Sequence, residues 1–327
     1  MNSNSGELKV FAGRTARPLT EKICDHIGIP VGEARTEAFP DGELLVRIEE
    51  DVRGRDCFVV SSTCYPVNDN LMELLIFCDC LKRASARRIT LVLPYYGYAR
   101  QDRKSEGRTP ITAKLVANLM TAARADRVLA VDLHAAQIQG FFDLPFDHLS
   151  ATPVFIDYFE SIRHEMPELC LVSPDVGNVK VAEGLANRLS GDLAIVNKRR
   201  LAADHVETSS QIIGTVENKT VLMFDDMIST GGTVAQAAEL VIEKGARDVV
   251  IAATHPVLAN RGAQKLAAGP ISRVIVTDTI PLSDERRTVL GDKLVVLSVG
   301  GLLGDAIRNI HEDRSVSALF RHVELKR

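Results

Sequence analysis

The chain has no tryptophan, five tyrosines and six cysteines among 327 residues, and no two cysteines form a Cys-x-x-Cys pair. This usage disfavours a zinc site or a disulfide framework, so we expect reduced thiols that pack as small hydrophobic side chains. Apolar runs such as 89–93 and 294–299 have the length of strands, so no membrane span is expected. The first ten residues lack the cationic start and apolar stretch of a signal peptide. We therefore expect a soluble, cytoplasmic protein.

Neither sign of charge is in large excess, because 39 Lys and Arg stand against 43 Asp and Glu, for a formal net charge of -4. A strongly basic surface is therefore absent, and we expect neither nucleic acid nor a membrane as a partner. The length predicts two domains, and Pro145 and Pro153 flank a short mixed segment after which the pattern of elements restarts. We place the domains at 1–150 and 151–327, each of roughly 150 residues, a common domain size.

Short apolar, β-branched runs alternate with helical patterns along the whole chain. One helix is expected from a cap at Asn68 through Leu81, a second after an N-cap at Thr109 with Pro110 in the first position, and a third over 233–244. Strands without polar alternation are typical of sheets that are covered on both faces. The alternation predicts an α/β fold with mainly parallel sheets. The expected strands are 89–93, 127–133, 169–172, 193–196, 221–224, 248–253, 274–277 and 294–299.

The sharpest motif is an acidic pair, Asp225 and Asp226, between the predicted strand 221–224 and a glycine- and hydroxyl-rich loop that opens a helix. Glycines let backbone amides approach a ligand closely, and the helix N-terminus favours an anion such as phosphate. Carboxylates at the end of a strand suit sugar hydroxyls or a metal ion. The motif therefore indicates a phosphorylated sugar, and the alternative is a plain strand–turn–helix junction. The loop residues are Ser229, Thr230, Gly231, Gly232 and Thr233.

This loop resembles the phosphoribosyl-pyrophosphate (PRPP) motif that phosphoribosyltransferases share with PRPP synthetases, and alone it does not separate the two. Other segments are similar to motifs of the ribose-phosphate pyrophosphokinase (PRPP synthetase) family, in collinear order over nearly the whole chain. They are Phe39-Pro-Asp-Gly-Glu43, Asn68–Ala84, Tyr95–Lys104, Asp132–Phe142, Val172–Asp175, Lys198–Arg200 and Ser315–Phe320. A phosphoribosyltransferase gives no reason for the segments at 39–43 and 100–104. A non-catalytic regulatory relative is the other alternative.

The resemblance implies two phosphoribosyltransferase-like domains, the last helix being able to pack back on the first. It also implies transfer of the β,γ-diphosphoryl group of ATP to the 1-hydroxyl of D-ribose 5-phosphate, which gives PRPP and AMP for nucleotide biosynthesis. Magnesium is the implied cofactor, and homohexamers are the family's assembly. The nucleotide-binding residues implied for the first domain, in which the ring of Phe39 stacks on the base, are Phe39, Asp41, Gly42, Glu43, Arg100 and Gln101.

The resemblance assigns the remaining roles to strand ends. His134 and Asp175 are the implied metal-site residues, and because Mg²⁺ prefers oxygen ligands, His134 suits phosphate or a metal-bound water better than direct ligation. Lys198 is the implied catalytic lysine, and Arg200 binds phosphate and assists catalysis. The residues implied to bind ribose 5-phosphate are Arg200, the two aspartates 225 and 226, and the loop 229–233.

The chain departs from the family pattern at three positions that lie in or near these motifs. Pro40 replaces a serine, Asn178 replaces a glycine, and Ser229 replaces an aspartate, which removes one negative charge from the sugar-phosphate loop. The polar, weakly patterned segment 201–214 is expected to be a mobile loop that closes over substrates. The segment 315–320 resembles one that contributes to phosphate activation and ADP inhibition; the alternative is an ordinary helix end.

Overall fold

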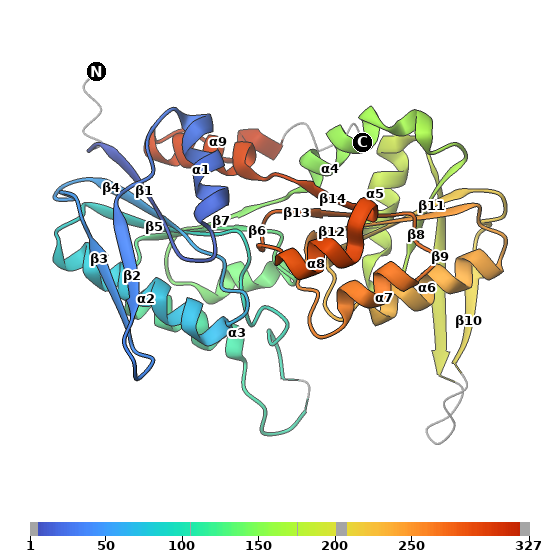
Figure 1. Cartoon of the computed structure of the whole chain (residues 1–327), viewed down its shortest axis with the longest axis horizontal. Helices are drawn as coiled ribbons and strands as arrows, with labels where there is room; N and C mark the ends of the chain where they lie inside the picture. Colours follow the sequence, from blue (N-terminus) through green and yellow to red (C-terminus); the bar gives the residue numbers. More distant parts are fainter. Residues whose placement is uncertain (1–5, 105, 175, 201–207, 321–327) are drawn as a thin grey trace. The chain divides into compact units, whose positions relative to one another are not determined.

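The computed structural model describes residues 6–104, 106–174, 176–200 and 208–320. The chain divides into two compact units (Figure 1). Unit 1 comprises Met1–Pro153, Thr279–Pro281 and Ser298–Arg327, and unit 2 comprises Val154–Asp278 and Leu282–Leu297. The C-terminal part of the chain therefore belongs to the same unit as the N-terminal part.

Unit 1 is built on a fully parallel sheet with the strand order β1-β4-β5-β6-β7. Every residue of β4 and all but the first of β5 are buried, which explains why these runs show no polar alternation. The expected strand 127–133 ends earlier, at Val131. The strands are β1 (Leu8–Ala12), β4 (Asp56–Val60), β5 (Arg88–Leu93), β6 (Arg127–Val131) and β7 (Phe146–Leu149).

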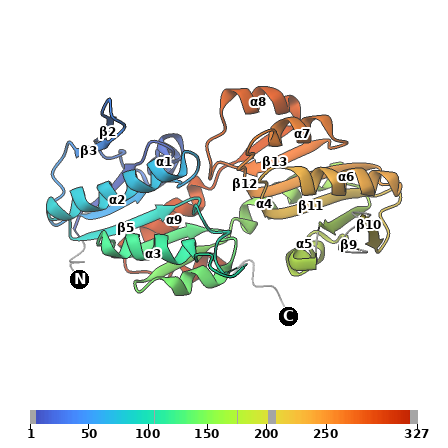
Figure 2. The ribbon, with the colours of Figure 1, turned by 90° about the horizontal axis from the view of Figure 1, so that it is seen from below.

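Helices cover both faces of this sheet. Helices α2 (Val67–Arg83) and α3 (Thr112–Ala122) lie on one face, and α1 (Arg17–Ile27) packs with α9 (Gly300–His311) on the other (Figures 1 and 2). An antiparallel hairpin, β2 (Ala34–Ala38) with β3 (Leu44–Ile48), packs beside α2, and short 3-10 turns occupy Ala136–Phe141 and Ser317–Phe320.

Two expected helix starts in unit 1 are wrong by a few residues. Asn68 lies inside α2, whose N-cap is Pro66, and the Asn70 side chain instead donates to the Cys64 carbonyl at 2.9 Å. Helix α3 begins at Thr112 with Ile111 as its N-cap, so Thr109 and Pro110 precede it. The first helix therefore starts before its expected cap, and the second starts after it.

Unit 2 contains a seven-stranded sheet with the order β10-β9-β8-β11-β12-β13-β14, parallel except for the pair β9–β10. The fold class is therefore the expected α/β class with mainly parallel sheets. The strands are β8 (Leu169–Ser173), β9 (Asp192–Arg200), β10 (Thr208–Ile213), β11 (Thr220–Met227), β12 (Asp248–His255), β13 (Arg273–Thr277) and β14 (Leu294–Leu297).

The strand order of unit 2 reverses between β8 and β11, since the chain leaves β8 toward β9 and leaves β11 toward β12. Right-handed crossovers then place α5 on the face opposite to α6 and α7, as Figure 2 shows. The helices are α4 (Thr152–Ser161), α5 (Val179–Leu189), α6 (Gly232–Glu243), α7 (Gly262–Ala268) and α8 (Asp284–Leu290), with 3-10 turns at Arg163–Glu165, Val176–Asn178 and Gly291–Lys293.

The mobile loop expected over 201–214 is partly wrong. Residues 208–213 form β10 and pair with β9 in an antiparallel register from Thr208 opposite Arg200 to Ile213 opposite Ile195. Residues 201–207 lie outside the described part of the chain. Within the described residues, no helix combines the length and apolar character that crossing a bilayer requires.

Candidate functional site

In unit 2 the acidic pair lies at the point where the strand order reverses. Asp225 and Asp226 are among the last residues of β11, and both are half-buried. The neighbouring β8 ends at Ser173, so the turn that follows it meets the same sheet edge. In open α/β sheets, ligands bind outside the carboxyl ends of strands at such a reversal. The expected position of the acidic pair at a strand end is thus confirmed.

Asn178 links the turn after β8 to the acidic pair. Its Nδ2 donates to the Phe224 carbonyl at 2.6 Å and lies 3.4 Å from Asp225 Oδ1. Asp225 Oδ1 also accepts the backbone N–H of Asp226 at 2.9 Å. These donors fix the orientation of the Asp225 carboxylate. The departure from glycine at 178 therefore gives this turn a side-chain contact that a glycine does not provide.

The loop that follows β11 is held by its backbone. The N–H of Leu258 donates to the Ile228 carbonyl at 2.9 Å, and the N–H of Ala259 donates to the Ser229 carbonyl at 2.8 Å. Because both carbonyls are engaged from outside the loop, its N–H groups keep a defined direction. The loop is therefore a preformed element.

Gly231 makes the turn into α6. Its φ of +71° lies in the left-handed region, and a Cβ atom there would lie 3.2 Å from the Gly262 carbonyl oxygen. Gly231 is the N-cap of α6 and has no side chain with which to cap the helix. The first backbone N–H groups of this twelve-residue helix can therefore bind an anion.

Lys265 is a residue of this region that the sequence motifs did not indicate. Its Nζ lies 3.8 Å from the position that a Cβ on Gly232 would occupy, which brings an ammonium group beside the loop 229–233. The side chain is exposed on the short helix α7. No signal in the sequence marks it, because the contact joins residues 33 positions apart along the chain.

Lys198 and Arg200 are placed by their backbone alone. The expectation that they follow a strand ending at Val196 is wrong, since β9 continues to Arg200. Lys198 pairs with Ser210, and Arg200 pairs with Thr208. The expected roles of their side chains therefore remain predictions, and so does that of Asp175, which lies outside the described residues.

In unit 1 the segment Phe39–Glu43 forms the loop of the β2–β3 hairpin. The N–H of Phe39 donates to the Glu43 carbonyl at 2.8 Å, and the N–H of Glu43 donates to Asp41 Oδ1 at 3.1 Å. Gly42 adopts a φ of +93°, which an L side chain rarely adopts. Phe39 is 48% exposed, so its side chain is accessible to a ligand. The structure thus shows a rigid turn that presents an aromatic ring and two exposed carboxylates.

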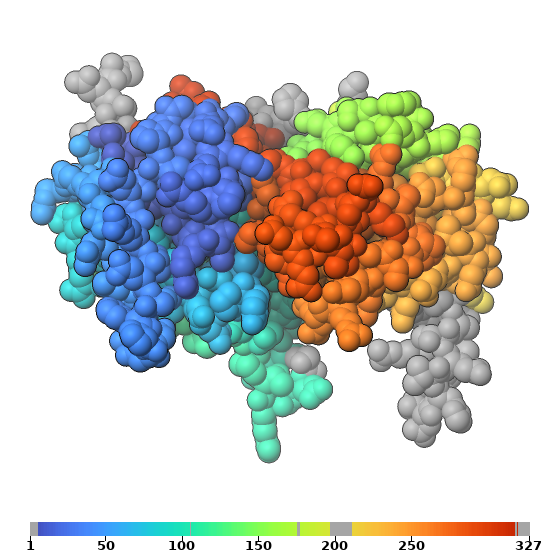
Figure 3. All heavy atoms as spheres, viewed as in Figure 1, coloured from blue at the N-terminus to red at the C-terminus, as the bar shows by residue number. Residues whose placement is uncertain are grey.

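Arg100 and Gln101 lie in the loop between β5 and α3, which projects from the body of unit 1 (Figures 1 and 3). The Gln101 side-chain oxygen accepts from the Thr112 hydroxyl at 2.5 Å, and its backbone carbonyl accepts from the N–H of Ala113 at 3.1 Å. Further along, Asp102 accepts from Gln137 Nε2 at 2.9 Å. With its oxygen bound, the Gln101 carboxamide is oriented to donate to a ligand through its NH₂ group.

His134 follows the end of β6, next to the strand β5 that leads to Arg100. Its side chain is exposed. The carboxyl ends of β5 and β6 therefore bring the Arg100 loop and His134 to one edge of the unit 1 sheet. Within the described residues, no three His, Cys, Asp or Glu side chains form a group that could hold a metal ion by themselves.

Two family models match the chain. Residues 8–123 match the N-terminal domain of ribose phosphate pyrophosphokinase, and residues 194–321 match the phosphoribosyl synthetase-associated domain. The first match covers the Phe39 hairpin and the Arg100 loop. The second covers Lys198 and the loop after β11.

Whole-chain comparisons agree with these matches. The chain is 56% identical to a ribose-phosphate pyrophosphokinase of Rhodopirellula baltica, over 96% of this chain and 99% of that protein. It is 51% identical to ribose-phosphate pyrophosphokinase 2 of Enterococcus faecalis, over 96% of each chain. The crystal structure of phosphoribosylpyrophosphate synthetase from Mycobacterium smegmatis is similar with a TM-score of 0.87 and 44% identity, covering 94% of this chain and 99% of that one. The chain belongs to the ribose-phosphate pyrophosphokinase family.

Proposed function

We propose that this chain is a ribose-phosphate diphosphokinase, which transfers the β,γ-diphosphoryl group of ATP to the 1-hydroxyl of D-ribose 5-phosphate. The products are PRPP and AMP. The observation that carries the proposal is the loop after β11, in which a helix start with glycine at its N-cap follows two strand-end carboxylates. Family membership over the whole length selects a diphosphokinase among the proteins that could use such a loop.

Unit 2 is proposed to bind ribose 5-phosphate. The N–H groups at the start of α6 and the hydroxyls of Ser229, Thr230 and Thr233 suit a phosphate dianion. Asp225 and Asp226 suit the 2- and 3-hydroxyls of the sugar, because ionised carboxylates accept hydrogen bonds from hydroxyl groups. Ser229 supports this arrangement because it places a hydroxyl, and no carboxylate, beside the phosphate.

Unit 1 is proposed to bind ATP. The exposed Phe39 ring offers a stacking surface for adenine, which is worth about 1–3 kcal/mol per base in aromatic stacking. Asp41 and Glu43 supply acceptors for the amino group or the ribose hydroxyls. Arg100 and Gln101 supply donors for the triphosphate or the base.

The chemistry asks for positioning and charge stabilisation and for little covalent participation by the protein. The anomeric hydroxyl attacks the β-phosphorus in line, and AMP leaves from the opposite side. Lys198 and Arg200 neutralise the negative charge that grows on the transferring group. We propose that His134 and Asp175 hold the magnesium site together with substrate phosphates. A bound Mg²⁺ would neutralise phosphate charge and orient the chain of phosphates.

The test is product analysis with the purified full-length chain, ATP, ribose 5-phosphate and Mg²⁺. We expect AMP and PRPP in equal amounts and no product when ribose 5-phosphate is omitted. Formation of ADP in place of AMP would contradict diphosphoryl transfer. Exchange of nucleobases with PRPP would instead indicate a phosphoribosyltransferase, and no turnover by an intact, folded chain would indicate a regulatory relative.

We further propose that the chain assembles as a homohexamer and works in the cytoplasm. Family resemblance supports the assembly. Large apolar side chains such as Met72 and Leu115, each 53% exposed, are candidates for burial at a subunit interface. None of the six cysteines forms a disulfide, which suits a reducing compartment. Light scattering of the purified chain tests the assembly; a monomer that is fully active would contradict it.

A further inference from the structure

The turn between β6 and His134 has an unusual backbone. Asp132 has a φ of +35°, in the region that residues with a side chain seldom adopt. The N–H of Asp132 donates to the Leu149 carbonyl at 2.9 Å, and Asp132 Oδ2 accepts from the N–H of Ala151 at 3.1 Å. The conformation is thus maintained from β7 and the residues just after it.

A third contact joins the same elements through a side chain. The N–H of Leu133 donates to His148 Nε2 at 2.9 Å. Nε2 accepts only when it carries no proton, so His148 is neutral with its hydrogen on Nδ1. Burial lowers the pKa of His148, which favours this neutral form. Leu133 is buried, and without His148 its N–H would lose this acceptor.

This bond lies beyond the backbone ladder of the two strands. The β6–β7 register pairs Ala130 with His148 and Val131 with Leu149, where β6 ends. The imidazole therefore contacts a backbone N–H two residues beyond the end of β6. The contact therefore supports the residue immediately before His134, in addition to the pairing of the edge strand.

We propose that His148 is a positioning residue, which acts through the Leu133 N–H to fix the turn that presents His134 to the metal and the ATP phosphates. The inference rests on the proposed role of His134. His148 itself is not proposed to touch substrate or metal. What it contributes is a fixed direction for the backbone on which His134 stands, in the way that groups behind a metal site orient its ligands.

The experiment compares three variants of the full-length enzyme. H148L removes the acceptor and keeps a similar volume, whereas H148Q keeps an acceptor near the position of Nε2. R127M is the control, because it removes the ion pair between Arg127 and Asp147 on the same two strands and leaves the turn contacts in place. Two properties are measured: hydrogen exchange of the peptide that contains Leu133, without metal or nucleotide, and the dependence of turnover on Mg²⁺ at saturating ATP and ribose 5-phosphate.

We expect H148L to lose exchange protection at Leu133 and to need about tenfold more Mg²⁺ for half-maximal turnover, as is usual for residues behind a metal site. H148Q is expected to keep both properties within about threefold of the parent, on the same scale. R127M should change neither property. The proposal is overturned if folded H148L keeps the parent's Mg²⁺ dependence, if H148Q is as impaired as H148L, or if R127M matches H148L.

An H134A variant separates this inference from the proposed function. If H134A shifts the Mg²⁺ dependence and H148L does not, the role of His148 fails and that of His134 stands. If H134A leaves the Mg²⁺ dependence unchanged, His134 has no part in the metal site, and the positioning role falls with it even where H148L loses exchange protection.

Discussion

At the scale of single residues, the proposed role of Lys198 in catalysis leads to a direct prediction. Its backbone pairs with Ser210 in the β9–β10 ladder, which places it in the sheet of unit 2. Replacing Lys198 with alanine should lower turnover by about 10²–10³, the usual cost of a lost transition-state donor. The KM values for both substrates should change much less, because the lysine acts on charge that develops only in the transition state.

Steady-state kinetics with both substrates measure this effect. R199A is the matched control, since it removes a neighbouring cation from the same strand. Normal turnover in a folded K198A enzyme would exclude the catalytic role. A similar loss in R199A would indicate that general positive charge, and not one placed ammonium group, is what matters.

Lys265 gives a prediction that only the folded chain could supply. Its ammonium group lies beside Gly232 at the start of α6, so we expect it to attract the phosphate of ribose 5-phosphate. The contact is exposed, and exposed charge pairs contribute up to about 1 kcal/mol. K265M should therefore raise the KM for ribose 5-phosphate by roughly threefold, with kcat nearly unchanged. The effect should shrink at high salt, and an unchanged KM at low salt would contradict it.

At the scale of elements, the sequence predicts strands and loops with unequal success. Buried parallel strands such as β5 and β11 contain apolar runs that composition alone predicts, whereas the short strand β4, which begins with Asp56, was not predicted. Strand β10 was not predicted, because its sequence Thr-Ser-Ser-Gln-Ile-Ile is polar at the start. Its position is set by pairing with β9. Local propensity does not encode such pairing, which depends on residues that precede it in the chain.

The candidate site shows the same limit. The glycines and hydroxyls of the loop 229–233 are neighbours in sequence, so a motif can predict them as a phosphate site. The Asn178–Asp225 contact and the His148–Leu133 contact were not found, since each joins separate strand ends. Motifs reveal groups that act as neighbours in sequence, whereas supporting contacts depend on the sheet order.

His148 on strand β7 also leads to a prediction of how the stability of the fold depends on pH. Burial lowers the pKa of His148, so the folded chain binds fewer protons at this site than the unfolded chain once the pH falls below the unfolded value of about 6.5. The contribution of His148 to stability is present above that pH and is lost as the pH falls toward its folded pKa. The stability advantage of the parent over H148Q should therefore decline between about pH 7 and pH 5.

Urea unfolding followed by tyrosine fluorescence measures this difference. Four of the five tyrosines, at positions 65, 95, 96 and 98, lie in unit 1, and the chain has no tryptophan to obscure them. If the free energies of unfolding of the parent and H148Q depend on pH in the same way, His148 is not held neutral by the fold.

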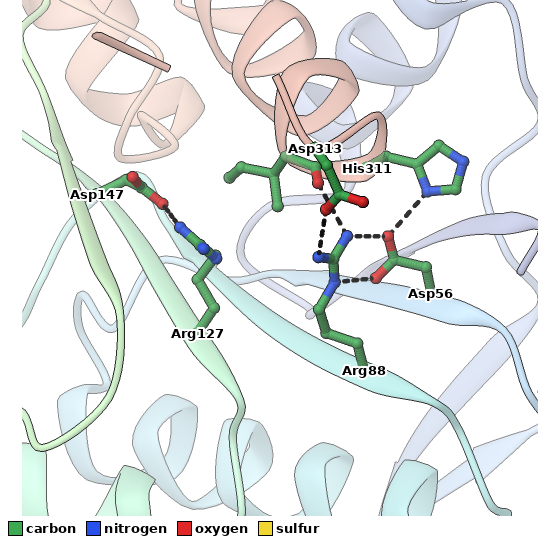
Figure 4. Close-up of polar contacts among 7 residues, drawn as sticks. Asp56, Arg88, Arg127, Asp147, His311 and Asp313 are labelled. Carbon is green, nitrogen blue, oxygen red and sulfur yellow. Dashed lines mark hydrogen bonds and ion pairs between the residues drawn. The ribbon is translucent and has the colours of Figure 1, made fainter. Parts of the chain in front are cut away.

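At the scale of the whole molecule, the C-terminal part of the chain is integrated into unit 1 by a charged cluster. Asp56, 2% exposed at the start of β4, accepts from Arg88 Nε at 2.8 Å and contacts His311 Nδ1 at 2.8 Å (Figure 4). Arg88 Nη2 also donates to the Ile310 carbonyl at 2.9 Å. The Asp56 carboxylate raises the pKa of Arg88, which stays charged. The end of α9 is therefore bound to the amino-terminal ends of strands β4 and β5.

Removing Arg88 should loosen this link and leave the Asp56 carboxylate buried with one partner fewer. We expect R88M to lower the free energy of unfolding of unit 1 by about 3 kcal/mol, the lower end for breaking a buried pair, since Arg88 is partly exposed. The Arg127–Asp147 pair in the same sheet is more exposed at its carboxylate, so R127M should cost about 1 kcal/mol or less (Figure 4). Tyrosine-detected unfolding and hydrogen exchange over α9 measure both effects.

The double variant R88M/D56L identifies the cause. If the loss in R88M comes from an unpaired buried charge, removing that charge as well should recover much of the stability, because apolar replacements of a buried pair are often nearly neutral. Exchange over α9 should stay fast in the double variant, since the bond from Arg88 to the Ile310 carbonyl is still missing. If the double variant is as unstable as R88M, the packing of the Arg88 side chain, and not the charge on Asp56, holds the C-terminal helix in place.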